Sequence, residues 1–268
     1  MTEVELTVRH ALEEDIGTGD VTSQACVPAD RRATGLFIAR QHLVLAGTEV
    51  LPVMYDQLHL RKQDGEEARD GEVIAEVRGR ARRLLECERT ALNFLQRLSG
   101  VATMARAFVE QVKGTQCKVL DTRKTTPGLR LLEKRAAAAG GVTNHRKGLY
   151  DAILIKNNHI AAAGGISQAL KNARGASQLP IEIEVRTRAE LREALDYGAT
   201  QLLLDNLTPA EAAEWIREIA ERATVEISGG VTLQNVRAYA ETGANFVSSG
   251  AITHSAQAVD LSFRLELV

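Results

Sequence analysis

Two patterns of hydrophobic and polar positions follow one another along the chain. In the first hundred residues, apolar positions three and four apart predict a helix over 2–16 and another over 47–56, with Pro52 near its first turn, where proline is tolerated. Apolar runs separated by polar turns predict strands over 33–40, 58–61 and 73–78. This part of the chain is therefore expected to form a small α/β layer.

A long helical pattern comes next. Apolar positions repeat with helical spacing over 80–111, and the Ser99-Gly100 pair within this range predicts a kink or a break. Arg89 lies on this helix, where an arginine taken alone is most often a surface or salt-bridge residue. We place the end of a first domain, residues 1–97, within this helix.

After residue 114 the pattern changes to short apolar runs that alternate with amphipathic segments. The runs predict strands over 117–120, 152–155, 181–185, 201–204, 224–227 and 246–248. The segments between them predict helices over 165–174, 188–197, 209–222 and 233–241. Strands and helices that alternate through short turns form right-handed crossovers and a parallel sheet. We expect the second domain, residues 98–257, to be a closed or nearly closed α/β barrel, with a doubly wound sheet as the alternative.

Composition narrows the range of functions. The net charge of −2 over 268 residues argues against a general nucleic-acid or membrane-surface binder. Three widely spaced cysteines, Cys26, Cys87 and Cys117, offer no disulfide framework and fit a reducing compartment. The first residues carry acids instead of a basic and apolar leader, and no apolar run is long enough to span a bilayer. We therefore expect a cytoplasmic protein with no nucleic-acid and no membrane partner.

Positive charge is concentrated in residues 121–159. This segment carries eight Lys or Arg and three acids, a net charge of +5 in a chain whose total is −2. Several of these cations follow predicted strands, at the edge where α/β barrels and sheets place their sites. The cations expected to meet an anionic ligand are Arg123, Lys124, His145, Arg146 and Lys156.

The other charges of this segment have simpler interpretations. A helix predicted over 129–139 carries Lys134 and Arg135, which are expected on its exposed face as solvated or salt-bridged side chains. His145 and His159 could each act as an acid or a base, and spacing alone does not choose between them.

Carboxylates occur in or directly after two of the predicted barrel strands. Glu182 and Glu184 alternate with period two and are expected to point together into the barrel, and Asp205 follows the strand over 201–204. Buried carboxylates need cations, so one interpretation is a structural Glu–Arg or Glu–Lys pair. The other is a hard-cation site at Glu184 and Asp205, such as Mg²⁺ that keeps several waters and meets a substrate phosphate.

Two glycine turns follow the last two predicted barrel strands. They are Ser228-Gly-Gly230 and Ser248-Ser-Gly250, with His254 just beyond them. Glycines let backbone N–H groups approach an anion, and the turns after the last strands are the usual phosphate site of α/β barrels. Two plain tight turns are the simpler interpretation.

Longer motifs are spread over nearly the whole chain. They include Glu14-Asp-Ile-Gly-Thr-Gly-Asp20, Glu88-Arg-Thr-Ala-Leu-Asn93, Asp121-Thr-Arg-Lys-Thr-Thr-Pro-Gly128, Asn144-His-Arg-Lys-Gly-Leu-Tyr-Asp151 and Ile153-Leu-Ile-Lys-Asn-Asn-His159. Together they resemble the quinolinate phosphoribosyltransferase family. Asn157 stands where this family often has Asp, and Ser249 where an apolar residue is common; neither touches the core of a motif.

The resemblance implies an incomplete, TIM-like α/β barrel preceded by an N-terminal α/β sandwich domain, on which residues 258–268 could pack back. It implies a pentosyl (glycosyl) transferase that uses Mg²⁺. This enzyme would transfer phosphoribosyl from 5-phosphoribosyl 1-diphosphate to quinolinate and release CO₂ and diphosphate. The product would be nicotinate mononucleotide for NAD biosynthesis. The resemblance also implies a homodimer in which each subunit completes the other's site, and a higher oligomer stays open.

The resemblance further implies roles for the candidate residues. Lys156, Glu184 and Asp205 would be catalytic, and the last two would hold the metal near the ribose. Arg89 would be donated across the dimer interface, contrary to its interpretation as a lone surface arginine, and Lys124 would meet the phosphoribosyl diphosphate. The residues that would bind quinolinate are Arg123, His145, Arg146 and Lys156. The residues that would cradle the 5-phosphate are Ser228, Gly229, Gly230, Ser248, Gly250 and His254.

Three other interpretations stay open on the sequence. An aldolase-like barrel would use Lys156 as a Schiff-base amine, but it leaves the many arginines and the acid pair unexplained. A molybdenum-associated relative of the same family is opposed by the intact motifs that begin at His145 and Lys156. A polyanion-binding module would show steep salt dependence and tolerate the loss of Glu184 or Asp205.

Overall fold

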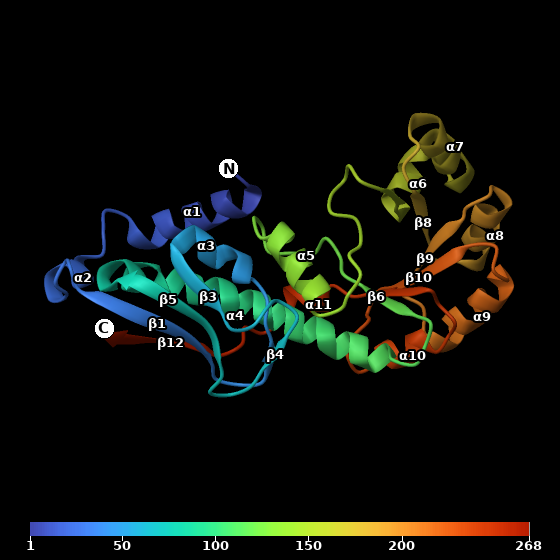
Figure 1. Ribbon diagram of the computed structural model, residues 1–268. Helices are drawn as coiled ribbons and strands as arrows, with labels where there is room; N and C mark the ends of the chain where they lie inside the picture. The colour runs from blue at the N-terminus through green and yellow to red at the C-terminus, as the bar shows by residue number, and fades with distance from the viewer. Residues whose placement is uncertain (268) are drawn as a thin grey trace. The chain divides into compact units, whose positions relative to one another are not determined.

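The computed structural model describes residues 1–267, which form two compact units (Figure 1). The first unit holds residues 1–106, 125–141 and the segment from Thr253 onward, and the second holds 107–124 and 142–252. The boundary predicted at residue 97 lies within the long helix α4 (Ala81–Val112) and stays a prediction, as does the boundary at residue 257. Among the residues described, no helix is both long and apolar enough to cross a bilayer.

The first unit mixes helices with antiparallel strands. Its strands are β1 (Arg32–Ala39), β2 (Leu43–Val44), β3 (Gln57–Leu60), β4 (Glu67–Ala68), β5 (Val73–Arg80) and β12 (Leu261–Leu267). Its helices are α1 (Glu3–Ile16), α2 (Val21–Cys26), the 3-10 turn η1 (Thr48–Val50), α3 (Leu51–Met54), α5 (Arg130–Ala139) and most of α4. The apolar pattern predicted the longer elements to within a few residues. It missed α2 and β12, and also β2 and β4, which are too short to show a period.

Four of these strands form one antiparallel sheet in the order β12-β1-β5-β3. The last strand pairs with β1 along its whole length, from Leu261 opposite Ala39 to Leu267 opposite Ala33. Phe37 of β1 meets Phe263 of β12 edge to face, with ring centroids 4.9 Å apart. The C-terminal strand therefore completes the sheet that the N-terminal part of the chain begins.

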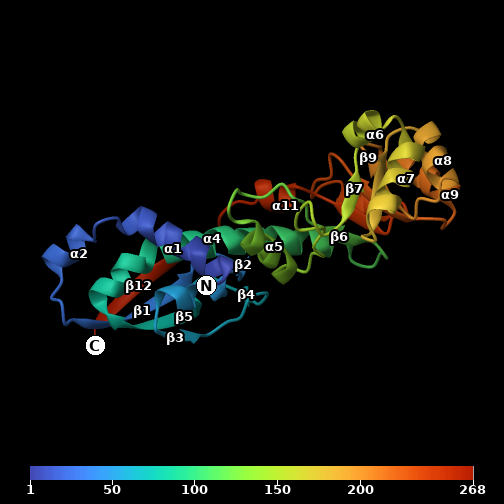
Figure 2. The same ribbon diagram turned by 90° about the horizontal axis from the view of Figure 1, so that it is seen from above.

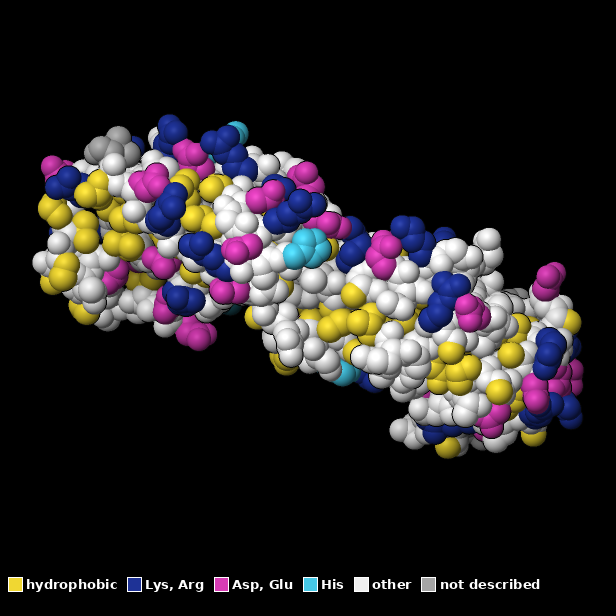
Figure 3. Space-filling view, turned by 90° about the horizontal axis from the view of Figure 1, so that it is seen from below, with side chains coloured by type: hydrophobic (Ala, Val, Ile, Leu, Met, Phe, Trp, Pro, Cys, Tyr) yellow, Lys and Arg dark blue, Asp and Glu magenta, His cyan; other side chains and the backbone are white. Residues whose placement is uncertain are grey.

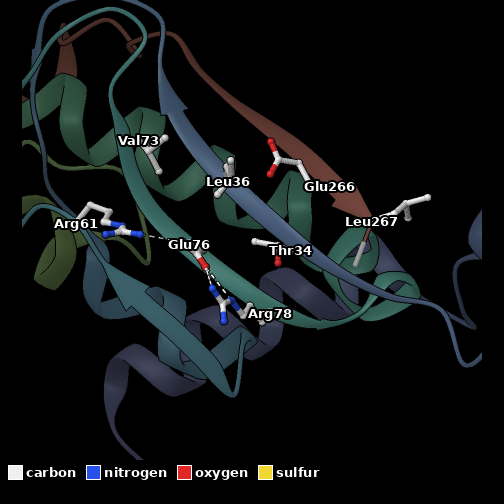
Figure 4. Close-up of a pocket in the computed structure, with 8 residues that line it drawn as sticks. All are labelled: Thr34, Leu36, Arg61, Val73, Glu76, Arg78, Glu266 and Leu267. Atoms are coloured by element: carbon white, nitrogen blue, oxygen red, sulfur yellow. Dashed lines mark hydrogen bonds and ion pairs between the residues drawn. The ribbon is translucent and has the colours of Figure 1, made fainter.

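The two faces of this sheet differ in burial. Phe37 and Val77 have no exposed surface on the inner face. A pocket on the other face is lined by side chains that include Thr34, Leu36, Glu76 and Arg78 (Figure 4). Glu76 pairs there with Arg61 at 3.1 Å and with Arg78 at 2.6 Å. One face thus packs on the core while the other carries ion pairs, as is common in antiparallel sheets.

The helix α4 runs through Ser99 and Gly100 without the predicted break. A Cβ added at Gly100 would lie 2.1 Å from the carbonyl oxygen of Gln257, so a close backbone approach requires glycine here. Ser99 is fully buried, and its hydroxyl accepts a hydrogen bond of 3.0 Å from the N–H of Ala46. The prediction of a break was wrong because these small residues serve packing against neighbouring segments, and the alternative of a kink stays a prediction.

The prediction that Lys134 lies on an exposed face of α5 was also wrong. Only 2% of Lys134 is exposed, whereas Arg135 is exposed as predicted and pairs with Glu49. The neighbouring Glu133 has no exposed surface and accepts hydrogen bonds from Nε and Nη2 of Arg97 at 3.0 and 2.8 Å. Helical period alone could not reveal that this charged stretch of α5 is buried.

The second unit alternates strands with helices. Its strands are β6 (Lys118–Leu120), β7 (Ile153–Ile155), β8 (Ile181–Val185), β9 (Gln201–Asp205), β10 (Thr224–Ser228) and β11 (Phe246–Ser248). Its helices are α6 (Asn157–Ala163), α7 (Ile166–Ala176), α8 (Arg188–Asp196), α9 (Pro209–Ile219) and α10 (Val236–Ala240). The short helix α11 (Ala251–His254) begins in this unit and ends in the first. Every one of these strands lies within a residue or so of a predicted apolar run, and α6 and α11 were not predicted.

These strands form one parallel sheet in the order β6-β11-β10-β9-β8-β7. The first strand, β6, pairs with the last, β11, through Val119 opposite Val247. A barrel returns its last strand to its first, whereas a doubly wound sheet reverses its order at an internal strand. The strand order therefore identifies an incomplete α/β barrel, with β7 at one edge and α8 and α9 on its outer side (Figures 1 and 2). The doubly wound alternative is excluded.

Candidate functional site

The candidate residues of the second unit gather at the carboxyl ends of β6 to β11, an edge that we call the barrel mouth. Parallel strands bring their carboxyl ends to the same edge of a sheet. The residues placed there are Arg123 and Lys124 after β6, Lys156 after β7, Glu184 near the end of β8, Asp205 at the end of β9, Ser228 at the end of β10 and Ser248 at the end of β11.

Two carboxylates at the barrel mouth are held by two cations. Glu184 is only 3% exposed, and its Oε2 lies 3.6 Å from Nζ of Lys156. Nη2 of Arg186 lies 2.8 Å from Oε1 of Glu184 and 2.9 Å from Oδ2 of Asp205. The buried Glu–cation pair, one of the two interpretations drawn from the sequence, is therefore present, and the hard-cation site at Glu184 and Asp205 stays a prediction.

Glu184 and Asp205 have the chemistry that a Mg²⁺ site requires. Both offer hard carboxylate oxygens at the ends of neighbouring strands. Oε1 of Glu184 is buried and accepts no hydrogen bond, because its 2.8 Å ion pair with Arg186 lacks hydrogen-bond geometry. A buried acceptor of this kind has a lone pair available to a cation. The residues present therefore fit the metal that the resemblance implies.

A second cluster surrounds His145. Its Nε2 lies 3.3 Å from Oε2 of Glu182 and 3.3 Å from Oε2 of Glu226. The side chains of His145, Glu182 and Glu226 are 16%, 13% and 3% exposed, so all three are largely removed from water. Glu182 comes from β8 and Glu226 from β10, which places this cluster among the barrel strands.

The charges around His145 retain a proton on this cluster. Burial alone lowers the pKa of His145, but the hydrogen bonds and charges of Glu182 and Glu226 outweigh it and raise the pKa to about 10. Burial raises the pKa of Glu182 as well. The N–H of Arg146 lies 2.7 Å from Nδ1 of His145, which favours an unprotonated Nδ1. We assign the proton to the Nε2 side, shared with the two carboxylates, so the three groups titrate as one unit.

Arg146 and Arg123 are close enough for their charges to interact. Burial and the positive charge of Arg123 lower the pKa of Arg146 below its usual value. Nη1 of Arg146 donates a hydrogen bond of 3.1 Å to the carbonyl of Ala152, which holds the side chain just before β7. An anion between two guanidinium groups relieves their repulsion, and each can bind a carboxylate through two hydrogen bonds. This pair is therefore suited to a ligand that carries carboxylates.

Asp121 orients the segment that carries His145. It is fully buried directly after β6, and its carboxylate accepts hydrogen bonds of 2.8 Å from the N–H of His145 and 2.7 Å from Nδ2 of Asn144. In the sequence, Asp121 stood out only as one of three acids within a basic segment. Its position after a buried strand was the signal that could have found it.

The two glycine turns meet through their serines. Oγ of Ser248 donates a hydrogen bond of 3.0 Å to Oγ of Ser228, because β10 and β11 pair in a register that makes these residues neighbours. Gly229 has a φ of +89°, and a Cβ added there would lie 2.3 Å from Oδ1 of Asn206. The fold thus brings the two turns to one place, as a shared anion site would require.

Ser249, which stands where the resembled family often has an apolar residue, is accommodated within the second turn. It is 4% exposed, and its Oγ donates a hydrogen bond of 2.6 Å to the carbonyl of Val231. The hydroxyl also accepts a hydrogen bond of 3.3 Å from the N–H of Ala251. The departure therefore adds hydrogen bonds and leaves no hydroxyl without a partner.

The remaining candidates have the following places. Lys124 is exposed, and its N–H donates a hydrogen bond of 3.1 Å to Oγ1 of Thr122. Gly230 is exposed after β10, and Gly250 comes directly before α11. Arg89, on α4, and His254 are exposed in the first unit, where Nδ1 of His254 lies 2.6 Å from Oγ of Ser255. The roles of these residues, like those of the residues above, stay predictions.

Sequence reasoning missed Arg186 and the contact of Glu226 with His145. Arg186 follows β8 as Lys156 follows β7, and Glu226 interrupts the apolar run of β10 as Glu182 interrupts β8. Both positions carried a visible signal, but Asp205 and His145, with which they pair, lie on other segments of the chain. His159, left open as an acid or base, accepts a hydrogen bond of 2.9 Å from the N–H of Lys156 through Nδ1, so its ring caps the start of α6.

Comparisons with known proteins agree with this architecture. The family model described as the N-terminal domain of quinolinate phosphoribosyl transferase matches residues 20–99, and the C-terminal domain model matches residues 101–264. The chain is 43% identical to the probable nicotinate-nucleotide pyrophosphorylase (carboxylating) of Bacillus subtilis, over 97% of this chain and 92% of that protein. It is 40% identical to the nicotinate-nucleotide pyrophosphorylase (carboxylating) of Mycobacterium leprae, over 97% and 96%.

Solved structures show the same similarity. The nicotinate-nucleotide pyrophosphorylase of Francisella tularensis superposes with a TM-score of 0.94 at 37% identity, over 98% of this chain and 96% of that one. NadC of Streptococcus pyogenes superposes with a TM-score of 0.95 at 37% identity, over 100% and 99%. Two domain models that together match most of the chain, and relatives of this identity and coverage, lead to one conclusion: the chain belongs to the quinolinate phosphoribosyl transferase family.

Proposed function

We propose that the chain transfers the phosphoribosyl group of 5-phosphoribosyl 1-diphosphate to quinolinate with decarboxylation, giving nicotinate mononucleotide, diphosphate and CO₂ in NAD biosynthesis. The observation that carries the proposal is the meeting of cations with the Glu184–Asp205 acid pair at the barrel mouth. A substrate with two carboxylates calls for the cations, and a diphosphate with its metal calls for the acids. Family membership and the names of the relatives support the same reaction.

The pyridine dicarboxylate would be held by the positive groups. Arg123 and Arg146 interact through their charges and can each grip a carboxylate with two hydrogen bonds. Lys156 adds a point charge that is 49% exposed and therefore reachable by a ligand. A planar ring held by both of its carboxylates has one orientation, which presents its nitrogen to the ribose.

The bond changes follow from the charges. The ring nitrogen attacks C1 of the ribose while the bond from C1 to the diphosphate oxygen breaks. Positive charge that develops on the ribose is stabilised by the carboxylates of Glu184 and Asp205. The pyridine nitrogen then carries a positive charge. When the neighbouring carboxylate departs as CO₂, the electron pair of the broken bond stays on the ring carbon, is stabilised by the adjacent positive nitrogen, and takes up a proton from water. Lys156 and the arginines keep the other carboxylate in place throughout.

Glu184 and Asp205 would hold Mg²⁺, which when bound offsets negative charge on the departing diphosphate. Their oxygens are of the hard type that this ion prefers, and Oε1 of Glu184 accepts no hydrogen bond. Ser228, Ser248 and the glycines beside them would receive the 5-phosphate, supported by the hydrogen bond that joins the two serines. These groups are neutral, so they would act through hydrogen bonds from hydroxyl and backbone N–H groups.

The proposal also has a quaternary part and a cellular part. We propose a homodimer in which Arg89 reaches the site of the partner subunit, since Arg89 is exposed and lies within the motif shared with the family. A cytoplasmic location fits three cysteines that are all free. Lys and Arg side chains are interspersed with Asp and Glu on the face drawn in Figure 3, which favours a small-molecule substrate over a nucleic acid.

The deciding experiment mixes the protein with quinolinate, 5-phosphoribosyl 1-diphosphate and Mg²⁺ and follows CO₂ and nicotinate mononucleotide. Both products should appear in equal amounts, and omission of any one component should stop the reaction. Nicotinate in place of quinolinate tests whether the second carboxylate is required. Product without CO₂ from quinolinate, or equal rates with nicotinate, would contradict the proposed reaction.

A binding measurement tests the assigned clamp separately from catalysis. Arg146→Ala should weaken quinolinate binding by about tenfold or more, because one bidentate charge-assisted contact is lost. Arg174→Ala is the matched control, since this arginine bonds the carbonyls of Tyr197 and Gly198 away from the barrel mouth. Unchanged quinolinate affinity in Arg146→Ala would show that the clamp is wrongly assigned. Borohydride with a carbonyl substrate should leave Lys156 unmodified, which separates this proposal from an aldolase.

A further inference from the structure

Arg186 joins the two carboxylates of the barrel mouth through a single nitrogen. Its Nη2 lies 2.8 Å from Oε1 of Glu184 and 2.9 Å from Oδ2 of Asp205. The pairing of β8 with β9 sets Val185 opposite Leu204, and this register brings the next residues, Arg186 and Asp205, side by side. The guanidinium therefore stands between two acids because of strand register.

The backbone of Arg186 is anchored while its side chain reaches into solvent. Its N–H donates a hydrogen bond of 2.7 Å to Oε2 of Glu190, within the hydrogen-bonded start of α8. The side chain is 45% exposed, in contrast to the 3% of Glu184 and the 13% of Asp205 that it contacts. An exposed arginine on a fixed backbone can turn away from its partners without disturbing the strands.

The electrostatics require a cation at this position. Two carboxylates that share one nitrogen repel each other, and a positive charge between them offsets that repulsion. Without a metal, Arg186 supplies this charge from within the chain. A divalent cation held by Glu184 and Asp205 would supply this positive charge instead and would bind the same two carboxylates. Guanidinium and metal are therefore alternatives at one place.

We propose that Arg186 is an internal counter-ion that competes with the divalent cation for Glu184 and Asp205 and is displaced when the metal enters. The inference rests on the proposed function, because it takes these two acids as the metal ligands. It makes Arg186 a positioning residue that keeps the acid pair in place in the absence of metal. Through this competition, Arg186 also sets the metal concentration at which the site becomes occupied.

Two observations favour displacement over a permanent bridge. The contact of Arg186 with Oε1 of Glu184 lacks hydrogen-bond geometry, so leaving it breaks no hydrogen bond at that oxygen. Lys156 lies 3.6 Å from the other oxygen of Glu184 and continues to offset its charge after Arg186 has left. The buried glutamate is therefore never without a cation nearby.

Direct binding of Mn²⁺, followed by the electron paramagnetic resonance signal of the free ion, tests the proposal without substrates. Arg186→Gln should bind Mn²⁺ about tenfold more tightly than the wild type, because the competing charge is gone. Arg188→Gln should match the wild type. Arg188 is 46% exposed and pairs with Glu214 and Glu218, so it is a control of the same type two residues away.

Further variants separate this inference from the metal assignment. Adding Glu184→Gln and Asp205→Asn to Arg186→Gln should abolish Mn²⁺ binding. Equal Mn²⁺ affinities of the wild type and Arg186→Gln, with binding lost in the triple variant, would overturn the counter-ion and leave the metal site in place. Binding that survives in the triple variant, or that is absent from every protein, would overturn the metal assignment and this inference together.

A conservative variant keeps the test decisive if Arg186→Gln does not fold. Circular dichroism reports whether Arg186→Gln is folded. If it is not, Arg186→Lys takes its place, since lysine keeps the positive charge but cannot present the same fork of N–H groups. Arg186→Lys should bind Mn²⁺ more tightly than the wild type, because the bridge from one guanidinium nitrogen to both carboxylates is lost. An affinity at or below that of the wild type would overturn the proposal.

Discussion

Nζ of Lys156 and Oε2 of Glu184 lie 3.6 Å apart at the barrel mouth. The lysine is 49% exposed and the glutamate 3%, so a cation that a ligand can reach is tied to a carboxylate that water cannot. Such a pair lets the protein keep a buried acid and also offer a positive charge to a substrate.

Lys156→Ala should lower kcat/KM for quinolinate by about 10²- to 10³-fold, because a charge aimed at the reacting substrate is lost. Steady-state release of CO₂ measures this. Lys171→Ala, an exposed lysine on α7, should behave like the wild type. A fall of less than threefold in Lys156→Ala would remove Lys156 from the catalytic residues.

Gly229→Ala should weaken the use of 5-phosphoribosyl 1-diphosphate and also destabilise the fold. The residue has a φ of +89°, and the added Cβ would lie 2.3 Å from Oδ1 and 2.8 Å from the backbone N of Asn206. Gly71→Ala is the control, because its φ is +83° and nothing lies within 4 Å of its added Cβ. The two variants share a cost of about 1 kcal/mol for the left-handed backbone, and only Gly229→Ala adds the clash. Equal unfolding temperatures and equal KM values would argue against a cradle at Gly229.

The cluster of His145, Glu182 and Glu226 should make stability depend on pH in the neutral to alkaline range. The pKa of His145 rises from 6.5 to about 10 on folding, so its stabilising contribution is complete below pH 6.5 and is lost as the pH rises toward 10. The difference in unfolding free energy between the wild type and His145→Gln should therefore shrink by up to about 1.4 kcal/mol per pH unit. Urea unfolding of both proteins measures this difference. The pH range runs from 6.5 to about 8.5, where it ends because cysteine thiols usually begin to ionise there.

The same cluster offers a second test of the direction in which stability changes with pH. Glu226→Gln removes one of the two carboxylates that raise the pKa of His145, so the pH dependence should become flatter. His10→Gln, an exposed histidine on α1, should leave the wild-type pH dependence unchanged. A stability difference that grows with pH would mean that the proton balance of the cluster is the reverse of the one assigned here.

Arg89→Ala and Arg146→Ala should each be nearly inactive and should complement one another when mixed. If Arg89 acts on the partner subunit, dimers that contain one chain of each kind hold one intact site. An equal mixture should then recover about one quarter of the wild-type rate, because about half of the dimers are mixed and each has one of two sites. Recovery of nothing after denaturation and refolding together would place Arg89 in its own subunit's site or outside any site.

Arg97→Ala should destabilise the first unit by about 3 kcal/mol, because it leaves the buried carboxylate of Glu133 without its cation, with only the hydrogen bonds from Thr126 remaining among those described. Glu133 has no exposed surface, and Nη2 of Arg97 lies 2.8 Å from its Oε1. Arg264→Ala breaks a pair that is more than half exposed, with Glu266, and should cost less than about 1 kcal/mol. Urea unfolding of the two variants compares them directly, and similar losses would show that burial does not govern this pair.

Much of the barrel could be predicted from the sequence because its signals are local. A buried parallel strand is a short apolar run, and the runs at Ile181–Val185 and Phe246–Ser248 coincide with β8 and β11. Cations that follow such runs closely, as Lys156 does directly and Arg123 after two further residues, are carried to the barrel mouth by strand geometry. Thr2 and Glu5 likewise form the capping box that starts α1, through contacts three residues apart.

Contacts between distant segments could not be predicted in the same way. Gly100 looked like a helix break, but its role is to let Gln257 approach the backbone of α4. Lys134 looked exposed because helical period tells which residues share a face and says nothing of what covers that face. Arg186 was overlooked because Asp205, one of its two partners, belongs to the next strand.

The amino-acid sequence by itself determined the strands, the helices and the kinds of charge that follow each strand, since these depend on residues close together in the chain. Only the tertiary structure decided the strand order that returns β11 to β6 and the register that sets Arg186 beside Asp205. It alone decided the enclosure of His145 by Glu182 and Glu226. Charges act through space, so their partners are set by the folded positions of the strands and not by separation along the chain.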